Sequence, residues 1–237
     1  MCNPYVLTGY KRPTSFYRSF ISAFEWHNET LNIHTHLWPG LIFVYWLFST
    51  DLSGMSLESK FTLIFGYIGA ITCMFTSVFF HIVLHVNSYW LKLSLNLDYV
   101  GIIAVNLGHQ LLNTLILVNG NPILFWPVVL CEFIFATKCA FDIIKKDMGR
   151  FWATRHPVIT SITTIIVLLL RNEHPAVYYS TGCSIFVIVA GSLFFIGRVP
   201  ERCLKGFDYY NSHVFHHICV VLGIISAIGA RKYIGDL

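Results

Sequence analysis

The sequence predicts an all-α integral membrane protein: a bundle of seven transmembrane helices with a cytosolic N-terminus and an external C-terminus. Three observations lead to this prediction: the low charge, seven long apolar runs, and an uneven distribution of positive charge. Of the 237 residues, 55% are hydrophobic and only 12% are charged. Soluble domains are about one quarter charged, so this composition indicates a chain surrounded by lipid.

The apolar runs have the length that a bilayer requires, since a membrane helix needs about 20 mostly apolar residues. The seven runs cover residues 33–52, 62–84, 97–118, 122–141, 153–170, 177–197 and 212–230. The first run contains Pro39 and Gly40, and the fifth is continuously apolar only from Pro157 to Leu170. The loops between the runs are short, so residues 33–237 are expected to form one transmembrane domain.

The residues before the first run form a cytosolic N-terminal segment, residues 1–32. This segment is mixed and polar, so no removable signal peptide is predicted and the first span directs insertion. Phe16, Phe20 and Phe24 recur at four-residue spacing, which predicts a short amphipathic helix. That helix either lies on the inner membrane surface or caps the bundle.

The positive charges set the expected orientation. With the N-terminus inside, the cytosolic segments contain 12 of the 16 basic residues: Lys11, Arg12, Arg18, Lys92, Lys138, Lys145, Lys146, Arg150, Arg155, Arg198, Arg202 and Lys205. The opposite side contains the remaining four: Lys60, Arg171, Arg231 and Lys232. Because cytosolic loops of membrane proteins are enriched in lysine and arginine, this bias favours an internal N-terminus and an external C-terminus. The seven cysteines include no C-x2-C pair, so reduced thiols are expected.

Counting the spans places a group of polar residues at one membrane level. The second span ends on the inner side, and the third and seventh spans begin there. His81 near the end of the second span, Asp98 near the start of the third, and His213 and His217 at the start of the seventh therefore share one level. This inference depends only on the number of segments.

These residue types at this spacing favour a zinc site. His213 and His217 lie four residues apart, on one helix face and about 6 Å apart along the axis. Histidine pairs with this spacing bind zinc, and His81 would supply a third imidazole. Three protein ligands leave a fourth position open, which is typical of catalytic rather than structural zinc sites. Asp98 could then accept a proton from a water molecule, and Ser77, one turn before His81, could hydrogen-bond nearby.

Other interpretations of the polar residues stay open at this stage. Interfacial histidines can simply be hydrated by headgroups, and a histidine cluster can bind haem or carry protons. His34 and His36 begin the first span at the same level and could line the site. His216 lies on a different helix face from His213 and His217, so it is expected either to support the site from beside the ligands or to face lipid, and His85 is expected at the membrane edge. His109 lies in mid-span, and Glu132, also in mid-span, has no obvious partner.

Six ordered motifs in this chain resemble the progestin and adipoQ receptor family, which includes the adiponectin receptors and the haemolysin III relatives. They are "LTGYKRP" (7–13), "FEWHNETLNIHTH" (24–36), "SVFFH" (77–81), "LDYVGI" (97–102), "RVPER" (198–202) and "FDYYNSHVFHH" (207–217). The resemblance implies seven helices with an internal N-terminus. It also implies zinc bound by His81, His213 and His217, with Asp98 and Ser77 as catalytic residues. The chain departs from the family pattern at Val214, where glutamine is usual, and at the additional His216.

The resemblance implies a membrane zinc-dependent hydrolase or receptor of the adiponectin receptor type. Its expected activity is cleavage of the amide bond of ceramide-like lipids, with lipid signalling as the output. An extracellular protein or a steroid is a possible further ligand, and no nucleic acid partner is expected. The expected location is the plasma membrane, the Golgi or the endoplasmic reticulum. The alternative is a non-catalytic seven-helix receptor or membrane scaffold in which zinc is structural.

Overall fold

The regular structure of this chain is helical wherever the structure describes it. The computed structural model describes residues 3–170 and 175–231. Within these ranges there are eight helices: α1 (Phe16–Ser22), α2 (Thr30–Ser49), α3 (Leu57–Val83), α4 (Ser88–Leu117), α5 (Pro122–Lys146), α6 (Gly149–Leu170), α7 (Pro175–Gly197) and α8 (Ser212–Arg231). The prediction of an all-α fold is therefore confirmed for these residues.

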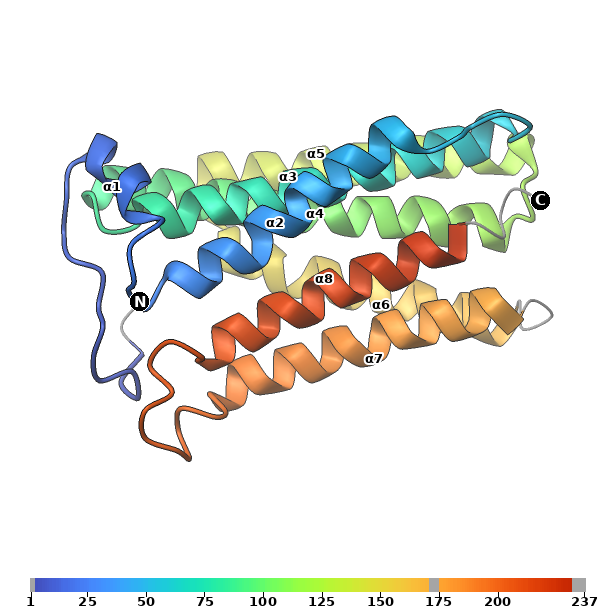
Figure 1. The fold of residues 1–237 in the computed structure, drawn as a ribbon. Helices are drawn as coiled ribbons and strands as arrows, with labels where there is room; N and C mark the ends of the chain where they lie inside the picture. Colours follow the sequence, from blue (N-terminus) through green and yellow to red (C-terminus); the bar gives the residue numbers. More distant parts are fainter. Residues whose placement is uncertain (1–2, 171–174, 232–237) are drawn as a thin grey trace.

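The seven longer helices run side by side along one direction, and α1 lies across one end of the bundle (Figure 1). The most extensive pairings join α3 to α4, α7 to α8, α2 to α3 and α4 to α6. Helix α8 also contacts α2 and α3, so it connects the α7–α8 hairpin to the other helices. This packing brings the beginning of α8 next to the end of α3, although more than one hundred residues separate them in the chain.

Each predicted apolar run coincides with one of the helices α2 to α8, but the helix ends differ from the run ends. Helix α4 begins at Ser88, nine residues before its apolar run, because the side chain of Asn87 accepts a hydrogen bond from the backbone N–H of Trp90 at 3.0 Å. Among the residues that the structure describes, five helices are long and apolar enough to cross a membrane: α3, α4, α5, α6 and the part of α8 from Ser212 to Gly229. In α7, residues Gly182–Gly197 form a shorter apolar segment.

The N-terminal helix α1 is shorter than the aromatic spacing predicted. It ends at Ser22, so Phe24 lies beyond it and is 74% exposed. The residues that α1 buries are Ser19 and Ser22. The ring of Phe16 stacks on Trp90 of α4 with 4.3 Å between centroids, which fixes α1 at this end of the bundle.

Helices α3 and α4 approach closely because small residues face each other along their contact. A Cβ atom added to Gly69 would lie 2.4 Å from the backbone oxygen of Ala104, and one added to Gly108 would lie 3.0 Å from the Cα of Gly66. Close approach at glycine is a common way for membrane helices to associate. The six cysteines of the described residues are all free, in agreement with the expected reduced thiols.

Replacement of Gly69 by alanine is expected to destabilise the bundle. The new Cβ collides with the backbone of α4, and the collision can be relieved only if one of the two helices moves. A cost of about 1–3 kcal/mol is typical of such overpacking. Thermal unfolding in detergent should show a lower midpoint for Gly69→Ala than for wild type. Gly182→Ala is the matched control, since a Cβ at Gly182 meets nothing within 4 Å; an equal loss in both variants would contradict the explanation.

Candidate metal centre

Three histidines from two distant segments converge at the end of the bundle where α1 lies. His81 is in the last turn of α3, and His213 and His217 are in the first two turns of α8. One nitrogen from each ring lies within 4.8 Å of the other two. The ring centroids are 5.0 Å apart for His81 and His213, 5.1 Å for His81 and His217, and 4.5 Å for His213 and His217. The predicted juxtaposition is thus present in the structure.

Two of the three rings are hydrogen-bonded through Nδ1 to residues at the beginning of α2. Nδ1 of His81 lies 2.8 Å from a carboxylate oxygen of Glu29, and Nδ1 of His217 lies 3.1 Å from the carbonyl oxygen of Asn32. Both partners are oxygen acceptors, so each Nδ1 carries a proton, and in the neutral tautomer the lone pair is on the Nε2 that faces the cluster. This is the arrangement by which proteins orient metal-binding histidines.

The inward-facing nitrogen of His81 supports a metal at this point. Nε2 of His81 is buried without a hydrogen-bond partner in the structure, and only 2% of the residue is exposed. A buried polar atom without a partner is costly. Three neutral imidazoles with convergent nitrogens are a donor set that suits zinc, so the residues present fit that metal.

The two predicted catalytic residues lie beside this cluster. The carboxylate of Asp98 on α4 is within hydrogen-bonding reach of Ser77 and within electrostatic range of His81. Ser77 lies on α3, one turn before His81, and is 3% exposed. The structure therefore brings all five predicted site residues to one place.

Across most of its length the sequence matches the family described as haemolysin-III related, over residues 24–228. The chain belongs to this family. Its relatives include an uncharacterised protein of Schizosaccharomyces pombe, at 28% identity over 94% of this chain and 54% of the relative. The ADIPOR-like receptor IZH2 of Saccharomyces cerevisiae is 28% identical over 94% of this chain and 77% of its own length. Membrane progestin receptor alpha of Mus musculus is 24% identical over 96% of this chain and 72% of its own length.

The resemblance to the progestin and adipoQ receptors is confirmed by these matches. The chain spans about half the length of the Schizosaccharomyces pombe relative. Membership of the haemolysin-III-related family, together with the five apolar helices, identifies an integral membrane protein.

Beyond the three clustered histidines, this haemolysin-III-related chain packs one further imidazole against the cluster. The ring of His36 stacks on that of His217, with 3.7 Å between centroids and 14° between planes. His36 is buried, in agreement with the possibility that it lines the site. His34 does not line the site. Its Nε2 atom lies 3.1 Å from the carbonyl oxygen of Ala23, outside the cluster.

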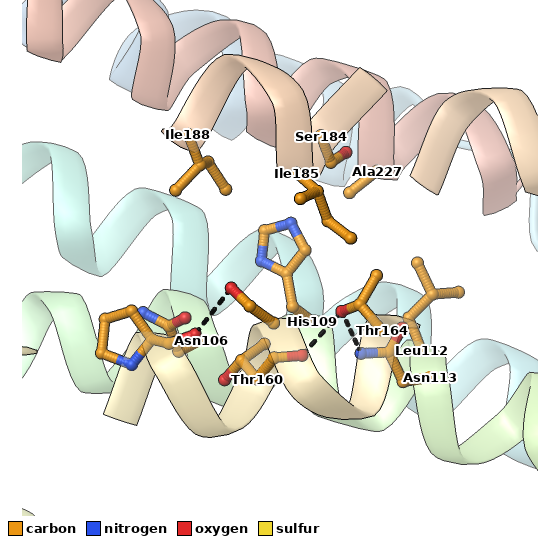
Figure 2. Close-up of a pocket in the computed structure, with 12 residues that line it drawn as sticks. Asn106, His109, Leu112, Asn113, Thr160, Thr164, Ser184, Ile185, Ile188 and Ala227 are labelled. Carbon is orange, nitrogen blue, oxygen red and sulfur yellow. Dashed lines mark hydrogen bonds between the residues drawn. The ribbon is translucent and has the colours of Figure 1, made fainter. Parts of the chain in front are cut away.

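Of the other polar residues that the sequence singled out, His216 lies beside the cluster, with 6.5 Å between its ring centroid and that of His213, whereas Glu132 and His109 have partners or neighbours elsewhere. His216 packs against Phe195 of α7, with 5.4 Å between centroids. Glu132 has a partner that the sequence did not reveal, because the hydroxyl of Thr114 donates to its carboxylate at 2.6 Å. His109 borders a separate cavity of about 30 Å³ between α4, α6, α7 and α8, where Asn113 donates to Thr164 at 2.8 Å (Figure 2).

Sequence reasoning missed two acidic residues that position the histidines. Glu29 orients His81, and Glu201 accepts a hydrogen bond from the backbone N–H of Ser212 at 2.7 Å at the first turn of α8. Glu201 is 4% exposed and also accepts from the side chain of Asn3 at 2.8 Å. Both acids lie within the motifs "FEWHNETLNIHTH" and "RVPER", but their contacts depend on how the loops fold over the end of the bundle where α1 lies.

An N-terminal strap, residues 3–13, crosses this end of the molecule near the cluster. The backbone N–H of Leu7 and the hydroxyl of Thr8 both donate to Asp208 at 2.6 Å. Nζ of Lys11 donates to the carbonyl oxygen of Ile82 at 2.6 Å. Ile82 directly follows His81 in the chain. Burial lowers the pKa of the Lys11 ammonium to about 8. The strap therefore ties the end of α3 to the loop that precedes α8.

Glutamine at Glu29 is expected to weaken zinc binding by about 10- to 100-fold, the usual effect of removing a carboxylate behind a histidine ligand. The glutamine amide can still reach Nδ1 but does not carry the negative charge that makes the imidazole a better ligand. Competition with a fluorescent chelator measures the affinity. Glu25→Gln is the matched control, since Glu25 is exposed and paired with Arg18; equal weakening in both variants would rule out a specific role for Glu29.

Proposed function

We propose that this protein is a zinc-dependent membrane hydrolase or receptor of the adiponectin receptor type, which cleaves the amide bond of a ceramide-like lipid. The observation that carries the proposal is the convergence of His81, His213 and His217 beside Asp98, with two of the rings fixed through Nδ1. Three neutral ligands and one adjacent carboxylate are the composition of a catalytic zinc site.

The proposed topology is seven spans, α2 to α8, with the N-terminus in the cytosol and the C-terminus outside. Its support is the set of seven apolar runs and the bias of 12 basic residues to four between the two sides. In this orientation the metal centre faces the cytosolic leaflet. The proposed location is the plasma membrane, the Golgi or the endoplasmic reticulum.

Each residue of the centre has a distinct chemical role in the proposal. His81, His213 and His217 would hold zinc, which polarises an amide carbonyl and lowers the pKa of water. Asp98 accepts the proton of the attacking water and transfers it to the leaving amine. Ser77 holds the carboxylate of Asp98 in position. Glu29 and Asn32 keep two of the rings aligned while the charge at the site changes.

The position of the centre favours a lipid substrate. It lies at the ends of α3 and α8, both of which are long and apolar enough to span a membrane, so a substrate can keep its chains in lipid. A fatty acid and a sphingoid base would leave as signalling products. An extracellular protein or a steroid is a further candidate ligand, because relatives of this chain include the adiponectin receptor protein of Drosophila melanogaster and membrane progestin receptor alpha of Mus musculus.

The second candidate is a non-catalytic receptor or scaffold in which zinc is structural. It is favoured by the way the centre joins three helices, since His81 and His217 contact the start of α2 through Glu29 and Asn32. Zinc would then fix α2, α3 and α8 together without any reaction.

An assay of ceramide hydrolysis separates the two candidates. The purified zinc-loaded protein, in lipid nanodiscs that contain labelled ceramide, should release fatty acid, and the release should stop when a chelator removes the metal. A known ceramidase in the same nanodiscs verifies the assay. If fatty acid is not released while the ceramidase is active, the structural candidate holds and the hydrolase is wrong.

A further inference from the structure

A cluster of exposed cations lies at the end of α5 and the beginning of α6. We call this the basic surface; it consists of Lys138, Lys145, Lys146, Arg150 and Arg155, all of which are exposed. The end of α5 and the start of α6 lie at the end of the bundle where α1 is found (Figure 1). Both helices are candidate membrane spans, so these cations lie at the edge of the lipid.

Acidic residues neutralise only part of this charge. Asp142, 2% exposed, forms ion pairs of 2.7 Å with both Lys138 and Lys146. The other nearby acid, Asp147, pairs with Lys92 of α4 at 3.1 Å. Lys145, Arg150 and Arg155 form no ion pair with a carboxylate in the part of the chain that the structure describes.

Apolar side chains alternate with the cations on the same surface. Phe141 and Ile144 are 54% and 53% exposed. The guanidinium of Arg155 lies over the ring of Phe151 at 3.7 Å, and the ammonium of Lys146 lies over Phe141 at 5.8 Å. Lysine and arginine side chains that lie along exposed aromatic rings are typical of the membrane interface. There the rings contact the acyl chains, and the charged groups extend to the lipid phosphates.

We propose that the basic surface binds the headgroup of an anionic phospholipid in the adjacent leaflet. The three cations without a carboxylate partner supply the charge that complements the headgroup, and Phe141 and Ile144 lie against the acyl chains. A soluble anionic partner fits less well, because the apolar residues continue along lipid-facing α5 and α6 to exposed Ile134 and Val158. The proposal does not depend on zinc or on hydrolysis.

The test compares nanodiscs of phosphatidylcholine with nanodiscs that contain increasing fractions of phosphatidylserine. The wild-type protein is expected to unfold at a higher temperature as the phosphatidylserine fraction rises, and native mass spectrometry should detect retained phosphatidylserine. In the triple variant K145Q/R150Q/R155Q, the thermal shift should largely disappear. Since each basic residue near a charged membrane contributes about a five-fold factor, apparent affinity should fall on the order of 100-fold.

A matched triple variant controls for net charge. R12Q/R202Q/K205Q removes the same charge from exposed positions outside α5 and α6, and should keep most of the wild-type shift. The proposal is overturned if both triple variants lose the shift equally, or if K145Q/R150Q/R155Q keeps it. If that variant does not fold in phosphatidylcholine, the single variant K145Q decides, because it should retain measurably less phosphatidylserine than wild type.

Soluble probes distinguish a lipid from a free phosphate. Inorganic phosphate and glycerophosphoserine, added to the detergent-solubilised protein, should leave the unfolding temperature unchanged. If either reproduces the effect of phosphatidylserine, the surface recognises a free anion and the assignment to a lipid is wrong.

Discussion

Alanine at His213 is expected to abolish stoichiometric zinc binding. His213 supplies one of three nitrogens that lie within 4.8 Å of one another, and two ligands cannot hold the ion as three do. Zinc affinity should fall by more than about 100-fold, which exceeds the effect of a residue that only orients a ligand. His81→Ala and His217→Ala should give the same result. Elemental analysis after gel filtration in mild detergent measures the zinc that remains.

His216→Ala is the control for this prediction. His216 is on the same helix and adjacent to His217 in the chain, but it packs against Phe195. It should keep the full zinc content of wild type. Zinc loss in His216→Ala equal to that in His213→Ala would mean that the start of α8, rather than a defined set of ligands, holds the metal. Retention of zinc by all three ligand variants would exclude the site.

Asparagine at Asp98 is expected to remove hydrolysis while zinc stays bound. The side chain keeps its shape and its contact with Ser77, but it can no longer accept a proton. Loss of a general acid–base residue lowers the rate by about 10²- to 10⁴-fold. Fatty acid release from ceramide in nanodiscs measures the rate, and elemental analysis of the same sample measures the zinc.

The control for Asp98→Asn is Glu132→Gln, which removes a carboxylate elsewhere in the bundle. Glu132 accepts from Thr114 and is not part of the cluster, so this variant should hydrolyse ceramide at the wild-type rate. A wild-type rate in Asp98→Asn would show that this carboxylate does not transfer the proton. Zinc loss in Asp98→Asn would instead assign Asp98 to metal binding.

The convergence of the three histidines was predictable because it follows from counting segments. Whichever side the chain begins on, the end of the second span and the start of the seventh lie at the same end of the bundle. The spacing of His213 and His217 then places both rings on one helix face. The structure confirms that His81 joins them, with 5.0 and 5.1 Å between its centroid and theirs.

The helix ends were less predictable than the helices. Apolar runs show which residues can face lipid, but side-chain caps decide where a helix begins. Asn87 starts α4 well before its apolar run, and Ser56 caps α3 at Leu57, several polar residues before its run. The short α1 shows the same limit, because its aromatic spacing continues to Phe24 although the helix ends at Ser22.

The contacts behind the histidines could not be predicted from spacing. Glu29 precedes the first span and His81 ends the second, and their 2.8 Å contact results from the packing of the turn before α2 against the end of α3. The partner of Glu132 was missed for a related reason: Thr114 is on the neighbouring α4 near the same depth, and sequence alone does not show which helices are neighbours.

The account depends most directly on one zinc ion held by the three imidazoles. Elemental analysis combined with zinc X-ray absorption on the purified wild-type protein tests this in one sample. We expect one zinc per chain, with histidine nitrogens as the protein ligands at about 2.0–2.1 Å. Less than stoichiometric zinc after zinc loading, or a shell that contains sulfur or lacks imidazole, would contradict the account.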